Sequence, residues 1–383
     1  MQTQPSPSSR VRAAHAYWTL LFILTAAGVA SLPLPFKSPA SGTDENRALA
    51  TLPGWPATLG DVRRWTRRFE AYVQDAFPGR ERLIAVGHTL LWHWGSLRTY
   101  MVLEGKEEWL FLRNHFQTLD KTRGLFQLRG EAAARWVARY QQVEAELAKS
   151  GILLRLVVIP EKHTVYSEYL PDWARPGIAG PRGVPDQIVG ELSRRGVDGV
   201  LDLRPVFIAR RHERQLFWRT DSHWNPAGAI LALETLLPWL YPDHSEKVQD
   251  VLSRCWIKST GETLRGDLVN LLGVPGFRGE EENCLILREP RAIASGEWRT
   301  LWGVESPLRT RHEDGVPVKT LVLGDSFLNQ SWVAIAEAGV ETSFFSHRHM
   351  EISRSMLERE RPGVVLVMIN ERFLPEEGPR LTP

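Results

Sequence analysis

Beyond about residue 150, short apolar runs alternate with amphipathic segments. The apolar runs have the length of buried strands and occupy Leu153–Ile159, Gly199–Leu203, Lys319–Leu323 and Gly363–Ile369. The segments between them predict helices at Asp186–Arg194, Pro226–Leu240 and Ser331–Ala338. Strands that are buried on both faces and alternate with helices are typical of a mostly parallel sheet. The pattern therefore predicts an α/β fold, an α/β/α sandwich.

The first 150 residues contain two apolar stripes with helical spacing. One consists of Trp65, Phe69, Tyr72, Val73 and Phe77, and the other of Trp136, Tyr140, Val143 and Leu147. Core packing accounts for both stripes. Between them, residues 101–103 and 109–111 are apolar and flank Gly105, which predicts a hairpin with its turn at this glycine.

The N-terminus predicts a location outside the cytoplasm. Arg10 and Arg12 precede an apolar stretch from Ala16 to Leu34, the arrangement of a secretory signal or an uncleaved signal anchor. The stretch is close to the minimum of about 17 residues for a spanning helix. Gly28-Val29-Ala30 also offers small residues for signal cleavage, so both alternatives stay open, although we favour the anchor. We therefore assign residues 1–40 to a signal peptide or anchor with its linker, and 41–383 to one domain.

Composition narrows the class of protein. The 383 residues are 43% hydrophobic and 24% charged, as expected for a globular protein, and the formal net charge is +2. This charge argues against a nucleic-acid binder built on a basic face. The two cysteines, Cys255 and Cys284, are compatible with one disulfide in an exported protein or with two free thiols. Two cysteines without nearby partners make a poor zinc site, so we expect no metal and no cofactor.

A serine follows one of the predicted strands directly. In Leu321-Val322-Leu323-Gly324-Asp325-Ser326, a buried strand runs through a glycine into the serine, and a helix follows. This arrangement places a hydroxyl above the carboxyl end of the sheet, where open α/β sheets bind their ligands. The alternative is a serine that caps the next helix.

A histidine and an aspartate lie at a second predicted strand-to-helix transition. Asp221 and His223 are two residues apart, so an extended backbone points both side chains to the same side. A histidine held by an aspartate and facing a serine is the arrangement for acyl transfer. The alternative is that Asp221 caps the helix at Pro226 and His223 is a surface residue.

These two segments resemble a known family. Gly-Asp-Ser at 324–326 resembles the nucleophile block of SGNH hydrolases. Asp-Ser-His-Trp at 221–224, upstream of the serine, resembles the alginate O-acetyltransferase branch, whereas ordinary SGNH hydrolases carry this pair near the C-terminus. The likeness spans most of residues 45–374, with weaker matches at Glu45-x-Arg47, Gly105–Phe111, Pro160-x-Lys162, Gly266-Asp267-Leu268 and Asn370–Leu374.

The resemblance implies an SGNH hydrolase-like α/β/α sandwich and an O-acetyltransferase that modifies an exported, alginate-like polysaccharide. It implies Ser326 as nucleophile, His223 as base and Asp221 as the residue that orients it. Members of this family are periplasmic, often tethered to the inner membrane, and work with a membrane-bound acyltransferase that supplies acetyl groups and with other secretion subunits. We expect the same location and partners here, and no nucleic acid.

Three further residues are weaker site candidates. Asn370 ends a predicted strand and is a candidate second oxyanion donor or a turn residue. Lys162 and Tyr166 follow the first buried strand and either border the same cleft or serve packing. Asp267 is interpreted as a structural carboxylate. Two rival functions remain: a polysaccharide acetylesterase with the same three residues, and a non-catalytic sugar-binding subunit of a secretion complex.

Overall fold

The structure is a computed structural model that describes residues 50–56, 58–76, 80–94, 99–175, 183–295, 308–346, 350–374 and 378–382. Contacts divide the chain into two compact units, residues 1–93 and 94–383. The proposed anchor lies outside the described residues, so the boundary at residue 40 stays a prediction. Within the described ranges, no helix combines the length and the apolarity needed to cross a membrane.

The described part of the first unit is helical. It contains η1 (Leu59–Asp61), α2 (Val62–Ala76) and α3 (Arg80–His93). The helix predicted from the first apolar stripe is confirmed as α2, where Trp65 stacks on Trp55 and on Phe69 with ring centroids 5.5 and 4.9 Å apart. Only Tyr72 of this helix is buried, so the prediction that the stripe packs into a core is correct in part.

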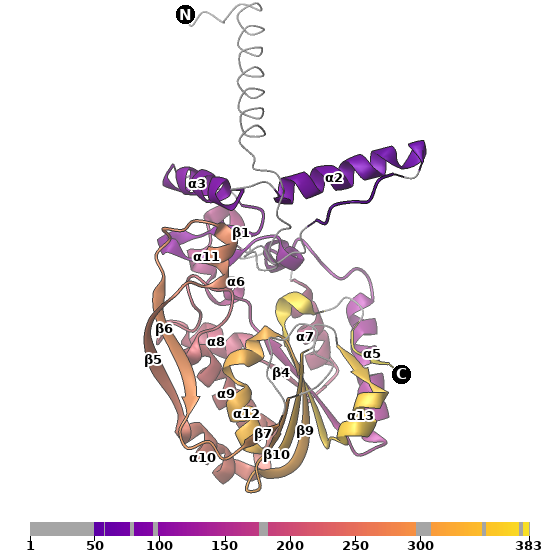
Figure 1. Cartoon of the computed structure of the whole chain (residues 1–383). Helices are drawn as coiled ribbons and strands as arrows, with labels where there is room; N and C mark the ends of the chain where they lie inside the picture. The colour runs from indigo at the N-terminus through magenta and orange to yellow at the C-terminus, as the bar shows by residue number, and fades with distance from the viewer. Residues whose placement is uncertain are drawn as a thin grey trace, which may run out of the picture. The chain divides into compact units, whose positions relative to one another are not determined.

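The second unit is built on a seven-stranded sheet (Figure 1). In spatial order its strands are β4 (Val200–Asp202), β3 (Leu153–Ile159), β12 (Val364–Asn370), β9 (Val316–Gly324), β10 (Gly339–Ser346), β8 (Leu308–Arg311) and β7 (Ile293–Ser295). The first five run parallel and the last two pair antiparallel at one edge. All four predicted strands are present, and the mostly parallel sheet is confirmed.

Helices cover both faces of this sheet, which makes an α/β/α sandwich (Figure 1). One face packs on α5 (Ala132–Ala148), α7 (Val184–Arg194) and α13 (Arg354–Glu360). The other packs on α8 (Arg204–Arg210), α9 (Pro226–Leu240), α10 (Ser245–Arg254) and α12 (Trp332–Ala338). Alternate residues of β3 point into the two cores, because successive side chains of a strand face opposite sides. The three predicted helices and the stripe on α5 are confirmed.

The predicted hairpin is also present, as β1 (Val102–Glu104) paired antiparallel with β2 (Leu110–Leu112). A Cβ atom at Gly105 would lie 2.4 Å from the carbonyl oxygen of Tyr169, so the backbone packs too closely there for any side chain. Short elements complete the unit: α4 (Thr118–Thr122), α6 (Lys162–Val165), α11 (Asp267–Leu272), and β11 (Glu351–Ser353) parallel to β13 (Arg380–Thr382).

The structure contains a pair of long antiparallel strands that the sequence pattern does not predict. β5 (Cys255–Leu264) pairs antiparallel with β6 (Glu280–Leu287), and most of β5 is exposed. The two cysteines are not bonded, because Cys255 lies opposite Leu287 and Cys284 lies opposite Lys258. The alternative of two free thiols is therefore correct.

Candidate active site

Ser326 lies at the carboxyl end of a central strand. β9 ends at Gly324, and Ser326 begins the short helix η7 (Ser326–Gln330). The buried Asp325 fixes this turn, since its carboxylate accepts from the N–H of Phe327 at 3.0 Å and from the N–H of Asn370 at 2.8 Å. The second bond joins the serine turn to the end of β12. Asp325 caps the helix, and the Ser326 side chain stays partly exposed.

Asp221 and His223 lie in a loop between α8 and α9, so the strand predicted before α9 is wrong. An antiparallel bridge between Phe217 and Trp224 joins its two ends. The helix after it, α9, begins at Pro226 and is capped by Asn225, whose side chain accepts from the N–H of Gly228 at 3.0 Å. The interpretation of Asp221 as the helix cap is therefore wrong.

Charged side chains from three other elements satisfy the polar backbone groups of this loop. The ammonium group of Lys162 donates to the carbonyl oxygens of Trp218, Arg219 and Asp221 at 2.8, 2.9 and 2.8 Å. The carboxylate of Glu280 accepts from the N–H groups of Arg219 and Thr220 at 2.9 and 2.7 Å. The carboxylate of Asp267 accepts from the N–H and the hydroxyl of Ser222. Each of these groups would be costly to bury without a partner.

The loop brings the predicted residues into a hydrogen-bonded line. The imidazole Nδ1 of His223 lies 2.7 Å from Oδ1 of Asp221, and its Nε2 lies 2.7 Å from Oγ of Ser326. Asp221 Oδ1 also accepts from the N–H of His223 at 2.9 Å, and its Oδ2 accepts from the N–H of Asp267 at 2.9 Å. With the carboxylate on Nδ1, the tautomer that carries its proton there leaves Nε2 free to accept the serine proton.

The charges around His223 favour its protonated form. Burial alone would lower the pKa of His223, but the carboxylates of Asp221 and Asp267 outweigh burial and raise it to about 8. Burial likewise opposes the ionisation of Asp221, yet His223 and the backbone donors hold the pKa of this carboxyl well below its usual value. Asp221 is therefore ionised beside the imidazole over the whole neutral range.

The side chains of Lys162 and Tyr166 are buried against the loop that carries Asp221 and His223, so they do not border an open cleft. Lys162 is 1% exposed, and its ammonium group lies 5.5 Å from the ring centroid of Trp109. Burial lowers the pKa of Lys162 to about 7, but three accepting carbonyls favour the ammonium form because only that form has three N–H donors. The Tyr166 hydroxyl accepts from the N–H of Leu216 at 2.8 Å. Both residues support the loop.

Asn370 belongs to a turn. Its side-chain oxygen Oδ1 accepts from the N–H of Arg372 at 3.0 Å, and its side-chain Nδ2 donates to the carbonyl oxygen of Pro160 at 3.2 Å. The side chain is completely buried. Of the two interpretations left open by the sequence, the turn residue is the one that matches this geometry.

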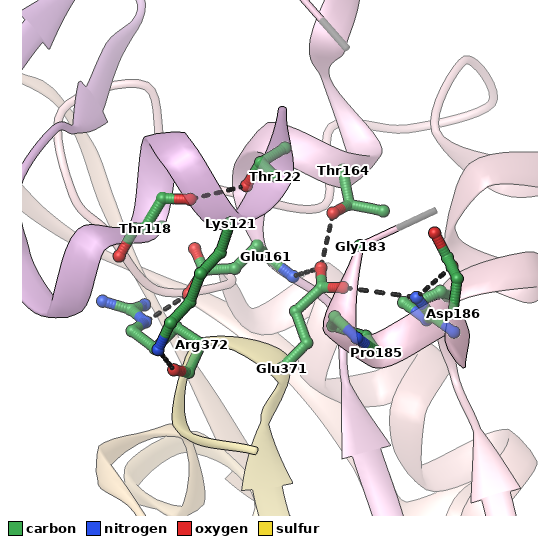
Figure 2. Close-up of a pocket in the computed structure, with 11 residues that line it drawn as sticks. Thr118, Lys121, Thr122, Glu161, Thr164, Gly183, Pro185, Asp186, Glu371 and Arg372 are labelled. Atoms are coloured by element: carbon green, nitrogen blue, oxygen red, sulfur yellow. Dashed lines mark hydrogen bonds and ion pairs between the residues drawn. The ribbon is translucent and has the colours of Figure 1, made fainter. Parts of the chain in front are cut away.

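A buried ionic cluster lies beside Asn370 and lines a cavity of about 150 Å³ (Figure 2). Arg372 forms an ion pair with Glu161. The carboxylate of Glu371 accepts from the N–H of Glu161 at 2.6 Å, and its Oε2 lies 3.5 Å from the guanidinium Nη1 of Arg204. Burial raises the pKa of Glu371 to about 7, an effect that Arg204 only partly offsets. The cluster ties the turn after β3 to the turn after β12, at the edge of the sheet that also carries Ser326.

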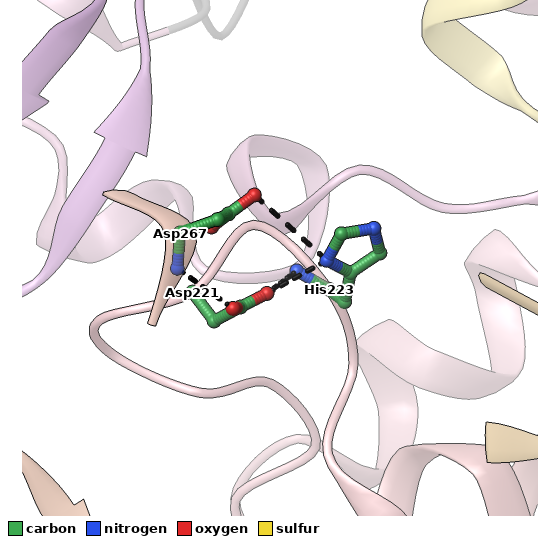
Figure 3. A group of neighbouring side chains, drawn as sticks. All are labelled: Asp221, His223 and Asp267. Atoms are coloured by element: carbon green, nitrogen blue, oxygen red, sulfur yellow. Dashed lines mark hydrogen bonds and ion pairs between the residues drawn. The ribbon is translucent and has the colours of Figure 1, made fainter. Parts of the chain in front are cut away.

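Asp221, His223 and Asp267 are also the one group of possible metal ligands found among the described residues (Figure 3). Their donor atoms lie within 4.8 Å of one another. A metal ion would have to break the bond between Nδ1 and Asp221 and compete with the donors that already satisfy both carboxylates. The arrangement is that of a proton-transfer line and does not fit a metal site.

An α/β/α sandwich with a serine, a histidine and an aspartate in line at the carboxyl edge of the sheet defines an SGNH hydrolase-like protein. Residues 102–283 match the family model described as "SGNH hydrolase-like domain, acetyltransferase AlgX". PatB1 of Bacillus cereus, solved with a sulfonyl adduct, shares the fold with a TM-score of 0.52 and 14% identity, over 72% of this chain and 97% of PatB1. Slightly less than half of the chain is thus similar to the SGNH hydrolase-like acetyltransferase domain, and the fold shared with PatB1 agrees with this similarity.

Curated relatives with a similar sequence are named for alginate O-acetylation. "Probable alginate O-acetylase AlgJ" of Pseudomonas aeruginosa is 27% identical over 237 residues, which cover 59% of this chain and 55% of the relative. AlgJ of Pseudomonas syringae pv. tomato, which has the same description, is 29% identical over 181 residues, 45% of this chain and 42% of the relative. The chain thus spans about half the length of the curated relatives it matches.

Proposed function

We propose that this protein is an O-acetyltransferase that acetylates hydroxyl groups of an exported, alginate-like polysaccharide. The observation that carries the proposal is the line from Asp221 through His223 to Ser326, with 2.7 Å at each side-chain step. The match to the acetyltransferase family model and the names of the AlgJ relatives support the acetyl group and the polymer as substrates. We further propose that the protein works together with other subunits of polysaccharide secretion.

The reaction proceeds in two halves on one serine. In the first, Ser326 Oγ attacks the acetyl carbonyl of a donor while His223 Nε2 takes the serine proton and returns it to the leaving group. In the second, His223 removes the proton of a sugar hydroxyl, and the sugar oxygen attacks acetyl-Ser326. The sugar ester leaves, and the proton returns to Ser326. Asp221 stabilises the imidazolium in both halves. Ser326 is the first residue of η7, and the first N–H groups of a helix have no acceptor within it. The N–H of Ser326 is therefore a donor for the oxyanion.

The proposed setting follows from the N-terminal sequence and the family. The protein works in the periplasm, tethered to the inner membrane by its N-terminal apolar segment. A membrane-bound acyltransferase delivers acetyl groups to Ser326, and the polymer is the acceptor.

Transfer is tested against hydrolysis with the full-length protein, an activated acetyl ester and candidate oligosaccharides. The proposal expects ester groups to accumulate on the sugar, with less free acetate as the sugar concentration rises. Release of acetate that is independent of the sugar would identify a polysaccharide acetylesterase. Sugar binding that survives replacement of both His223 and Ser326, without any turnover, would identify a binding subunit.

The acidic limb of the pH profile is expected near pH 8. His223 accepts a proton only when it is neutral, and its pKa is raised to about 8, so the rate rises with pH through that value and levels off above it. Initial rates of ester turnover between pH 5 and pH 10 measure this midpoint. A rate independent of pH over this range would show that His223 is not the base.

A further inference from the structure

Asp267 approaches the Asp221–His223 pair from a distant part of the chain. It is the first residue of α11, which follows β5 by two residues. The backbone of Gly266 lies so close to the loop that a Cβ atom there would be 2.3 Å from the carbonyl oxygen of Thr220. This contact admits no side chain at residue 266, and it places Asp267 beside Asp221 and His223 (Figure 3).

Asp267 forms hydrogen bonds with two residues of the segment that carries Asp221 and His223. Its carboxylate accepts from the N–H of Ser222 at 2.7 Å and from the Ser222 hydroxyl at 2.6 Å. Its own N–H donates to Oδ2 of Asp221 at 2.9 Å. Asp267 thus binds the residue between Asp221 and His223 as well as Asp221 itself. A shift of this side chain would move both catalytic side chains.

Asp267 also places a second negative charge near the imidazole. Its Oδ2 lies 3.9 Å from Nδ1 of His223, compared with 2.7 Å for Asp221. Burial and the neighbouring Asp221 raise the pKa of Asp267, whereas the two hydrogen bonds from Ser222 favour its ionised form. An opposite charge at this distance stabilises the imidazolium.

We propose that Asp267 is a positioning residue of the site: it fixes the Asp221–His223 segment through Ser222, and its charge stabilises the protonated His223. This inference rests on the proposed function, in which His223 is the base. The other charged groups near His223 are Asp221 on its own loop, Asp325 after β9 and Arg372 after β12. Arg372 acts in the opposite direction and lowers the pKa of His223, so the carboxylates determine the net effect.

The test compares Asp267→Asn with Ser222→Ala in the full-length protein. Asparagine keeps the shape of the side chain and removes its charge, whereas alanine removes the hydroxyl contact and keeps the charge. In Asp267→Asn, the midpoint of the acidic limb should fall by about one pH unit, because a carboxylate within about 4–6 Å typically shifts a pKa by that much or more. In Ser222→Ala the maximal rate should fall while the midpoint stays in place.

Direct titration of the His223 imidazole by NMR provides a second reading, which needs a folded protein and no turnover. It should show the same displacement in Asp267→Asn and none in Ser222→Ala. If the maximal rate of Asp267→Asn falls while the His223 midpoint stays at the wild-type value in both the rate profile and the NMR titration, the electrostatic role is overturned. Asp267 would then be a structural residue. Failure of the wild-type protein to form an acetyl-enzyme would count against the proposed function, whereas the titration would still decide the role of Asp267. If Asp267→Asn does not fold, Asp267→Ser serves the same comparison.

Discussion

Replacement of Ser326 by alanine is expected to reduce acetyl transfer by at least about 10⁴-fold. The alanine variant has no oxygen to attack the donor, so His223 Nε2 faces a methyl group in place of the hydroxyl at 2.7 Å. Loss of a nucleophile in a serine triad costs on the order of 10⁶ in turnover, and the residual rate comes from binding and oxyanion stabilisation. Initial rates with an activated acetyl ester and an oligosaccharide acceptor measure the loss.

Ser331→Ala is the matched control for Ser326→Ala. Ser331 lies between η7 and α12, five residues beyond Ser326, and is 1% exposed. Its replacement removes a hydroxyl from the same connection without touching the line to His223, so turnover should be close to wild type. Equal losses in the two variants would mean that the segment is needed for folding and that Ser326 has no special part in the reaction.

Lys162→Met should have the largest effect on stability. The substitution keeps most of the apolar stem and removes the ammonium group. The carbonyl oxygens of Trp218 and Asp221 lose their donor, whereas that of Arg219 keeps the N–H of Leu110 at 2.9 Å. A buried acceptor without a partner costs about 1–3 kcal/mol, so we expect a loss of roughly 3–5 kcal/mol. The melting temperature should fall by on the order of 10 °C.

Turnover by Lys162→Met should fall as well, because the same carbonyls fix the loop that carries Asp221 and His223. Lys149→Met is the control, since Lys149 is exposed and, among the described residues, forms an ion pair only with Glu146 on the preceding turn. Thermal unfolding of the three proteins compares them directly. A Lys162→Met protein that melts like the wild type would contradict the assignment of Lys162 as the internal support of the loop.

The strands that carry the site are predictable because they are buried on both faces. Leu153–Ile159 coincides with β3, and the run ending at Leu323 identifies β9, which extends one residue further to Gly324. Since the carboxyl ends of parallel strands meet at one edge, the sequence alone is enough to place Ser326 there. That His223 faces Ser326 is predicted from the chemistry that each residue type offers and from the family resemblance.

The support of the site is not predictable, because it depends on contacts between distant segments. Lys162 and Asn370 are correctly expected near this edge of the sheet, yet their polar atoms face carbonyl and N–H groups of the protein. The sequence indicates only a structural carboxylate at Asp267, and the distance of 3.9 Å to His223 has no signal in a single sequence. The β5–β6 strand pair could not be predicted, because its exposed residues show no regular alternation of apolar and polar positions.

The most direct test of the central claim is the intact mass of the full-length protein after brief exposure to an activated acetyl ester. The account predicts one acetyl group on Ser326, located by peptide mapping, absent in Ser326→Ala and slow to form in His223→Ala. Added oligosaccharide should discharge this adduct faster than water does. An acetyl group on another residue, formed equally well in Ser326→Ala, would contradict the account.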